Sequence, residues 1–454
     1  MLPILFIILL LEGFITISVE VLTIRQLLPF FGGSVLITRI IIGGFLLFLA
    51  LGYWRGGAYK HDFLKQLTRN FSLSLLWIGI GLSYSFIAFF YYVSAYQLHM
   101  PFLLSLTIYL LFVLAPIVYW LGQTVPITTN LFNQDQRVSR ISGSALFLST
   151  IGSFLGAIVT SLLFFQYLGV AYTVAINCIL LFLLVVLLQR KLPFAPVKWV
   201  LLVLAMVLIL FLNINVERLH FVRTNNYGNY RVLTTPDFSR MLQINESSSS
   251  SIGKDKRAFP YIEFIRKILF TDFKLENKDI LVIGAGGFTL TAKGAHHNNV
   301  TYVDIDPDIK SLSEQHFLHD TIKGRFIGMD ARRYLVQNDK QYDVILSDVY
   351  SHQATIPPAL LTVEYFQRLK RHLRKDGLMI ANIIASPMFD DAFSQRVYNT
   401  IFSVFPFCTV TPLNWEDPLT NVIYICPNRP ADMSVYRDDL STSTTDFFKS
   451  AYLR

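Results

Sequence analysis

The sequence has few charged residues, and the shortage lies in its first half. Only 15% of the 454 residues are charged, against about 25% in soluble globular proteins. Residues 1–213 contain 11 Lys and Arg but 4 Asp and Glu, whereas residues 214–454 contain 28 and 27. This excludes an ordinary soluble enzyme, and the 38 Phe and 22 Tyr residues exclude a disordered chain. The basic surplus flanks apolar segments instead of forming one soluble patch, so we expect no nucleic-acid partner.

Cysteine is also scarce, with three residues, and no His/Cys cluster has the spacing of metal ligands. We therefore expect no metal cofactor. Cys178 lies in an apolar segment and is interpreted as a small apolar residue. Cys408 and Cys426 lie on two strand-like runs, 404–411 and 420–427, and would face each other across a hairpin. They form either a disulfide, which suits an oxidising compartment, or a pair of core thiols.

Long hydrophobic runs are abundant in the first half. A membrane-spanning helix needs about 20 apolar residues. Seven stretches have this length and composition: 3–24, 34–54, 71–93, 102–121, 144–166, 169–188 and 197–213. Together they leave no polar surface to cover a soluble core, and the first lacks the basic start and cleavage site of a signal peptide. The pattern predicts a polytopic α-helical membrane domain of about seven spans, with the lipid bilayer as its partner.

Basic residues between these stretches give an orientation. They occur in alternate loops: Arg55, Lys60, Lys65, Arg69, then Arg137, Arg140, then Arg190, Lys191, Lys198. The positive-inside rule places these loops in the cytoplasm, and seven spans then place the second half outside. The first stretch also holds two carboxylates on roughly one helix face, Glu12 and Glu20. They are either a binding or proton site or a structural pair near Arg25.

The second half shows strands alternating with helices. Short buried runs occur at 279–283, 300–303, 324–329, 342–346 and 378–382. This alternation predicts a parallel, doubly wound Rossmann-like sheet. Before it, residues 225–244 suggest a β-hairpin, and the polar run 245–254 suggests a mobile loop. We expect a transmembrane domain over 1–213, a hairpin and loop region over 214–260 and a Rossmann-like domain over 261–454.

Polar residues follow these strands at their carboxyl ends, where such sheets bind ligands. The turn Gly284, Ala285, Gly286, Gly287 follows the first strand and allows close backbone approach to a ligand. Asp304, Asp330 and Asp348 follow the next three strands. There they can accept hydrogen bonds from ribose hydroxyls or from a base amino group, or they can cap a helix. Four such features in order favour a nucleoside ligand. No Gly-Lys-Ser/Thr follows the turn, which excludes a P-loop triphosphate site.

These motifs resemble spermidine synthase, the aminopropyltransferase built on the class I methyltransferase fold. The similarity covers about 225–427 and includes Ile283-Gly284-Ala285-Gly286-Gly287, Val303-Asp304-Ile305-Asp306-Pro307, Met329-Asp330-Ala331-Arg332, the run 342–348 ending in Asp348, and the run 361–366. The first half, notably 13–57, resembles the helical domain of membrane-fused relatives of that enzyme.

The resemblance implies a role for each matched residue. Asp304, with Ile305, would hold the ribose, Asp330 with Ala331 the adenine, and the glycine turn the nucleoside and its sulfonium chain. Asp348 would face the reacting carbon. Further candidate residues are Tyr350 and Ser351 for catalysis and Tyr227 and Tyr261, which match tyrosines lining the family's substrate site.

The departures from the family pattern concern amine binding. Gly287 stands where spermidine synthases have an aspartate that grips the aminopropyl amine and repels the carboxylate of intact S-adenosylmethionine. Ser351 or His352 stands in place of a second aspartate that engages the diamine, and Gly228 replaces a glutamine. A diamine needs carboxylates, so these losses argue against ordinary polyamine synthesis.

The leading hypothesis from the sequence is therefore cleavage of S-adenosylmethionine to methylthioadenosine and homoserine lactone, driven by attack of the substrate's own carboxylate. One alternative is aminopropyl or other alkyl transfer to a second substrate. The other is a non-enzymatic nucleoside sensor or transporter. All three predict a small nucleoside ligand, and a homo-oligomer is left open.

Overall fold

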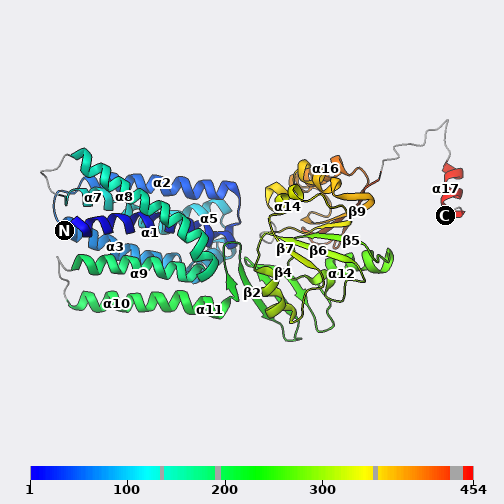
Figure 1. Ribbon diagram of the computed structural model, residues 1–454, viewed down its shortest axis with the longest axis horizontal. Helices are drawn as coiled ribbons and strands as arrows, with labels where there is room; N and C mark the ends of the chain where they lie inside the picture. Colours follow the sequence, from blue (N-terminus) through cyan, green and yellow to red (C-terminus); the bar gives the residue numbers. More distant parts are fainter. Residues whose placement is uncertain (1, 133–137, 190–195, 351–355, 430–442, 453–454) are drawn as a thin grey trace.

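The computed structural model describes residues 2–132, 138–189, 196–350, 356–429 and 443–452 of the chain. A bundle of long helices comes first, and an α/β part follows it along the longest axis of the molecule (Figure 1). The predicted helical half and Rossmann-like half are thus two successive parts of the fold.

The helical part contains six helices long and apolar enough to cross a membrane, or seven if one bent pair counts as a single span. Its helices are α1 (Leu2–Phe31), α2 (Val35–Gly57), α3 (Phe63–Gly81), α4 (Tyr84–Tyr91), α5 (Phe102–Tyr109), α6 (Ala115–Gly122), α7 (Thr124–Thr129), α8 (Val138–Val159), α9 (Val170–Gln189), α10 (Pro196–Leu210) and α11 (Val216–His220). Wider turns continue several of them, including η1 (Tyr92–Gln97) and η3 (Thr160–Leu168).

The third predicted span, 71–93, is broken rather than continuous. Helix α3 ends at Gly81, and α4 with η1 continues at an angle of 62°. Ser83 sets the new start, because its hydroxyl oxygen accepts a hydrogen bond from the Phe86 amide at 3.3 Å. A hydropathy pattern does not register such a cap, since every residue around it remains apolar or small.

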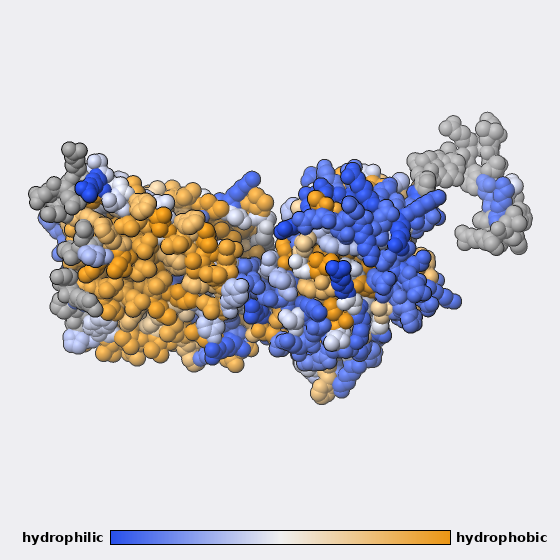
Figure 2. All heavy atoms as spheres, viewed as in Figure 1, coloured by the Kyte–Doolittle hydropathy of each residue, from blue (hydrophilic) through white to orange (hydrophobic). Residues whose placement is uncertain are grey.

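The surface of the bundle is apolar. Figure 2 shows hydrophobic side chains over most of the helical part and hydrophilic side chains over the α/β part. Large exposed side chains on the bundle include Trp54, Phe112 and Tyr167, at 77%, 69% and 72% exposure. Apolar surface on this scale is typical of contact with lipid or protein.

Helices α1 and α8 pack closely. A Cβ at Gly13 would overlap the Ser149 carbonyl, and one at Gly152 would overlap the Leu10 carbonyl. Small residues allow such approach in apolar bundles. Glu12 lies in this contact, 1% exposed, and accepts hydrogen bonds from Thr16 at 2.9 Å and Ser149 at 3.2 Å.

The α/β part is built on a seven-stranded sheet in the order β10-β11-β9-β8-β5-β6-β7. Its strands are β5 (Asp279–Ile283), β6 (Asn299–Asp304), β7 (Arg325–Gly328), β8 (Tyr342–Ser347), β9 (Leu373–Ala385), β10 (Thr409–Pro412) and β11 (Thr420–Pro427). Strands β5 to β9 are parallel, and β11 and β10 continue the sheet in antiparallel pairs. All five predicted strands are present.

The connecting helices of this part are α12 (Pro260–Arg266), α13 (Ile309–Leu312) with η7 (Ser313–Leu318), α14 (Ala331–Gln337), α15 (Val363–Arg371) and α16 (Ala392–Val404); α17 (Ser443–Tyr452) lies near the end of the chain. The core of the sheet is aliphatic, and Ile280, Leu281 and Ile345 are fully buried. This rigid sheet carries the polar residues that follow its strands.

Residues 223–252 form a second, four-stranded antiparallel sheet, which contains the hairpin predicted within 225–244 but has a strand where a mobile loop was predicted. Its strands are β1 (Arg223–Thr224), β2 (Asn229–Thr234), β3 (Arg240–Ile244) and β4 (Ser247–Ile252). The serine run predicted as a mobile loop is strand β4. The prediction was wrong because serine composition favours loops, whereas β4 pairs with β3 and the Ser250 hydroxyl accepts a hydrogen bond from the Gly287 amide at 2.9 Å.

The predicted pairing of Cys408 with Cys426 is confirmed. Strands β10 and β11 pair with Thr409 opposite Ile425, which places the two cysteines opposite each other, and they form a disulfide. Cys178, the third cysteine, is buried in the bundle as a free thiol.

Candidate nucleoside-binding site

The turn after β5 brings three strands together. Gly284 adopts φ +88°, and a Cβ there would overlap the carbonyl oxygen of Asp348. Its amide donates to the Val303 carbonyl at 2.9 Å, and the Asp348 amide donates to the Ile283 carbonyl at 2.9 Å. The carboxyl ends of β5, β6 and β8 therefore meet at this glycine, which tolerates both the positive φ and the close approach.

Asp304 ends β6 and faces the glycine turn. Its Oδ2 accepts a hydrogen bond from the Ala285 amide at 2.9 Å, and its Oδ1 accepts one from the Asp306 amide at 3.1 Å. Burial raises the pKa of this carboxyl above its usual value, and the backbone donors oppose that shift. Each carboxylate oxygen has a second lone pair, so Asp304 can still accept two ribose hydroxyls.

Asp348 follows β8 and is held by two side chains. Its Oδ1 accepts from the Asn382 amide at 2.9 Å, and its Oδ2 accepts from the Tyr261 hydroxyl at 3.0 Å. Burial raises the pKa of Asp348, while these two hydrogen bonds lower it. Burial and the Asp348 charge in turn raise the pKa of Tyr261 well above its usual value, so this hydroxyl remains a donor. The predicted pair Asp348 and Tyr261 is thus in direct contact.

The remaining predicted site residues lie less centrally. The Tyr350 hydroxyl accepts from the Ile384 amide at 2.5 Å, so it is tied to the backbone of β9. Asp330 is exposed and caps α14 by accepting from the Arg333 amide at 2.9 Å. Tyr227 is 36% exposed on the turn between β1 and β2. Asp330 therefore has the capping role that sequence reasoning kept open beside base recognition.

Two neighbours of these aspartates differ in exposure. Ile305 is 51% exposed beside Asp304, whereas Ala331 is 8% exposed beside Asp330. Ser351 and His352 lie outside the described residues.

The position that departs from the family pattern is crowded. A Cβ at Gly287 would overlap the Phe317 ring and lie 2.8 Å from Ser250 Cβ. An aspartate side chain therefore has no room here without displacement of Phe317 on η7 or Ser250 on β4. The packing of Phe317 and Ser250 therefore agrees with the presence of glycine, and not aspartate, at position 287.

Three functional candidates were not predicted from the sequence: Asn382, Asn421 and Ser250. Asn382, 3% exposed, bridges Asp348 and Asn421, whose amide donates to Asn382 Oδ1 at 2.9 Å. Ser250 binds the glycine turn. Asn382 is the last residue of the predicted run 378–382, so the strand-end signal that identified Asp304 and Asp348 also points to it, although the observed β9 continues to Ala385. Ser250 carries no such signal.

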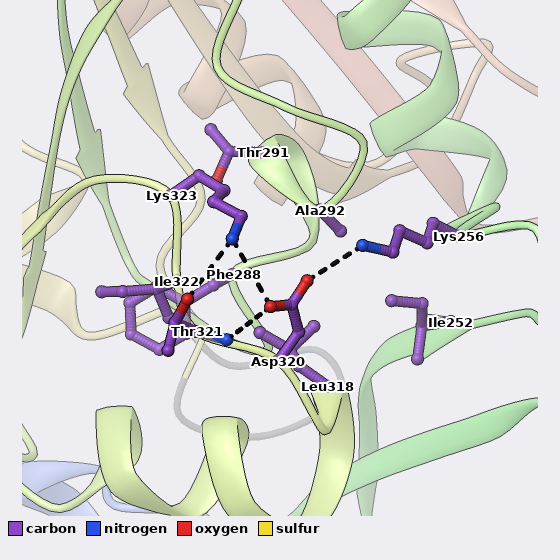
Figure 3. Close-up of a pocket in the computed structure, with 10 residues that line it drawn as sticks. All are labelled: Ile252, Lys256, Phe288, Thr291, Ala292, Leu318, Asp320, Thr321, Ile322 and Lys323. Carbon is purple, nitrogen blue, oxygen red and sulfur yellow. Dashed lines mark hydrogen bonds and ion pairs between the residues drawn. The ribbon is translucent and has the colours of Figure 1, made fainter.

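One pocket of the α/β part lies away from these residues. Figure 3 shows Asp320 at its centre, bound by Lys256 at 2.9 Å and by Lys323 at 3.4 Å, with Ile252 and Phe288 on the walls. Its charged groups already pair with one another, and no predicted site residue lines it, so we assign it no role in substrate binding. Within the described ranges, no group of three or more His, Cys, Asp or Glu side chains is arranged to hold a metal ion.

The strand order and the strand-end residues define a class of protein: an α/β domain of the class I methyltransferase type, with its candidate site at the carboxyl edge of the sheet. The spermine/spermidine synthase domain family matches residues 258–415. The C-terminal part of the chain is therefore a spermidine synthase-like domain.

The chain is also similar to individual curated proteins and to a solved structure. The chain is 25% identical over 206 residues to a polyamine aminopropyltransferase of Pyrobaculum islandicum, covering 42% of this chain and 69% of that protein. It is 24% identical over 213 residues to a polyamine aminopropyltransferase of Lachnospira eligens, covering 44% and 71%. A solved structure of a probable spermidine synthase from Corynebacterium glutamicum is 20% identical, covers 49% of this chain and 83% of that chain, and has a TM-score of 0.39.

Proposed function

We propose that the chain is a membrane-anchored enzyme that binds an S-adenosyl sulfonium compound and transfers its three-carbon chain, with release of methylthioadenosine. The observation that carries the proposal is Asp348, half-buried at the end of β8 and held by Asn382 and Tyr261 beside the glycine turn. The family match and the names of the relatives support aminopropyl transfer, which sequence reasoning ranks below lactone formation.

In the proposed transfer, an acceptor amine attacks the propyl carbon attached to sulfur. The new C–N bond forms as the C–S bond breaks, and the sulfur keeps the bonding electron pair, so methylthioadenosine leaves as a neutral thioether. The amine then carries an extra proton. Asp348 is the group we assign to receive it, because burial raises the pKa of this carboxyl above its usual value. Asp304 would hold the ribose, and the Gly284 to Gly287 turn would approach the sulfonium chain.

The crowding at Gly287 favours a second candidate, cyclisation of intact S-adenosylmethionine. Here the substrate's α-carboxylate attacks the same carbon, a C–O bond replaces the C–S bond, and homoserine lactone leaves with methylthioadenosine. Negative carboxylate and positive sulfonium cancel, so no proton is transferred. Without an aspartate at position 287, the carboxylate is spared the repulsion that this side chain would exert. Intramolecular attack gains an effective molarity of about 10⁵ M or more.

One assay separates these candidates. Purified full-length protein is incubated with S-adenosylmethionine alone, with its decarboxylated form alone, and with the decarboxylated form plus putrescine, and methylthioadenosine is measured by chromatography. Product only with putrescine supports transfer, whereas product from S-adenosylmethionine alone supports cyclisation. Bound methylthioadenosine without turnover in any mixture contradicts both and leaves the sensor or transporter reading.

We also propose that the bundle spans a bilayer and that the catalytic domain lies outside the cytoplasm. The α2–α3 loop, with Lys60, lies at the end of the bundle that carries the N-terminus, and the α/β part lies beyond the opposite end (Figure 1). The positive-inside rule favours the cytoplasm for the basic end. The Cys408–Cys426 disulfide supports an oxidising environment for the catalytic end.

A further inference from the structure

The helical bundle contacts the α/β part through a buried arginine. Arg25 on α1 is 4% exposed. Its Nε donates to the Asn225 carbonyl at 2.6 Å, and its Nη2 donates to the Asn229 side-chain oxygen at 2.8 Å. One of the two alternatives drawn from the sequence placed Arg25 near Glu12 and Glu20. The structure directs Arg25 to the residues that join β1 to β2 and begin β2.

Asn225 in turn contacts the loop after β6. It is fully buried, and its side-chain amide nitrogen donates to Asp306 Oδ2 at 2.9 Å and to Asp308 Oδ2 at 3.1 Å. The Asp306 amide donates to Asp304 Oδ1, and Asp304 Oδ2 accepts from Ala285 in the glycine turn. An unbroken chain of hydrogen bonds therefore runs from a bundle helix to the carboxylate assigned to the ribose.

The charges around this chain explain why it needs an arginine. Asp304, Asp306 and Asp308 lie within five residues of one another, and Asp306 is only 1% exposed. Tyr230 and Asn225 both donate to Asp306, and Arg223 pairs with Asp308 at 3.3 Å. Like charges this close disfavour a compact loop unless donors and cations offset them. Arg25 is a second cation on this side; unlike Arg223 it is buried, and it comes from the bundle.

We propose that Arg25 is a positioning residue: it fixes the Asn225 segment, and through Asp306 it sets the position of Asp304, so that nucleoside affinity depends on how the bundle is seated. This inference rests on the proposed nucleoside site. Loss of the guanidinium leaves the Asn225 carbonyl and the Asn229 amide oxygen buried without their donors, and the segment must then move to reach other partners.

The chain offers a matched control at the same junction. The Tyr84 hydroxyl on α4 donates to Glu246 Oε1 at 2.8 Å, which also joins the bundle to the α/β part. Glu246 lies in the turn between β3 and β4. Its chain neighbour Asn245 accepts from the Asn229 backbone amide at 3.0 Å, so this contact is joined to the Arg25 partners through the backbone between Asn245 and Glu246. Tyr84→Phe removes one interdomain hydrogen bond but none of the hydrogen bonds of the Arg25 chain.

The test measures binding of methylthioadenosine to full-length protein in lipid nanodiscs by calorimetry, alongside the unfolding temperature. We expect Arg25→Gln to weaken binding about 10-fold or more, Arg25→Lys to recover part of the loss, and Tyr84→Phe to stay within about 2-fold of the wild type. Asn225→Ala cuts the chain from the other side, so it should weaken binding similarly and add little to Arg25→Gln in the double variant.

Equal affinities of the wild type and Arg25→Gln would overturn the positioning role and leave the proposed function intact. Equal weakening by Arg25→Gln and Tyr84→Phe would also overturn it, because the effect would then follow from loosened domains in general. Wild-type protein that binds no methylthioadenosine would instead overturn the proposed function and this inference together. If Arg25→Gln fails to fold, Arg25→Lys and Asn225→Ala carry the same comparison.

Discussion

Asp348 is the residue on which the proposed chemistry depends. Its environment predicts that replacing it lowers activity without lowering stability. Burial raises its pKa in the folded state, so its favourable contribution to stability is present below the ordinary value of 3.8 and is lost as the pH rises through the raised value. Asp348→Asn removes this buried charge. We expect turnover to fall by about 100-fold or more, with an unchanged or raised unfolding temperature at pH 8.

The matched control for that variant lies on the same strand. Asp343→Asn, at the other end of β8, removes the negative charge that pairs with Arg374 at 2.5 Å but leaves the site untouched. It should retain activity and lose up to about 1 kcal/mol of stability. Methylthioadenosine release and thermal unfolding of both variants are the measurements. Wild-type turnover by Asp348→Asn would remove this residue from the mechanism.

Tyr261 should tune the pH dependence of transfer. Its hydroxyl donates to Asp348 and thereby lowers the pKa of that carboxyl. In Tyr261→Phe this hydrogen bond is lost, so the pKa of Asp348 rises. On acidification, a rate that depends on the unprotonated carboxylate then begins to fall at a higher pH than in the wild type. We expect the acidic limb of the kcat/KM profile to move upward by about one pH unit or less.

Tyr365→Phe is the control for that profile. Its hydroxyl bonds to Ser347 at 2.9 Å in the core, next to the aspartate in sequence but without contacting its carboxylate. Its acidic limb should coincide with that of the wild type. A downward shift in Tyr261→Phe, or an equal shift in both variants, contradicts this assignment of the proton acceptor.

Strand ends were the residue-scale signal that sequence could provide. Asp304 and Asp348 follow buried runs and were found this way. Tyr261, in contact with Asp348, lies 87 residues away along the chain, and only family resemblance suggested it. Ser250 could not be predicted, since its role depends on one amide of the glycine turn approaching β4 across the fold.

At the scale of elements, the contact between α1 and α8 makes a specific prediction. A Cβ at Gly152 would overlap the Leu10 carbonyl, whereas one at Gly143 on the same helix meets nothing within 4 Å. Gly152→Ala should therefore destabilise the bundle by about 1–3 kcal/mol. Gly143→Ala should leave it unchanged or stabilise it by up to about 1 kcal/mol. Unfolding in detergent, followed by circular dichroism, compares the two, and equal midpoints would contradict the close packing.

Elements were predictable where a pattern is repeated and less so where a single side chain decides. Strand β5 occupies the predicted 279–283, and the register of β10 with β11 followed from symmetry about their turn. The span over 71–93 breaks because one serine caps α4. Residues 247–252 form a strand because pairing with β3 overrides a composition that favours loops.

At the scale of the whole molecule, the two halves are functionally unequal but physically joined. The α/β part supplies every residue assigned to chemistry, and the bundle supplies Arg25, which is joined to the loop after β6 through Asn225. Carboxyl ends of parallel strands thus face the helical part, and a substrate that enters there does so near the junction.

The basic loops of the bundle and the disulfide of the α/β part both predict on which side of the membrane the α/β part lies. In a Cys178→Ser background, Cys408 and Cys426 are the remaining cysteines. We expect a membrane-impermeant maleimide to label intact cells only after an impermeant reductant opens the disulfide, because the catalytic domain then faces outward.

A separate variant without these three cysteines and with His61→Cys, in the exposed loop between α2 and α3, reports the basic end and should be labelled only after permeabilisation. Labelling of Cys408 and Cys426 only in permeabilised cells, without reductant, would place the site in the cytoplasm. The basic-loop rule and the disulfide would then both fail as guides to topology.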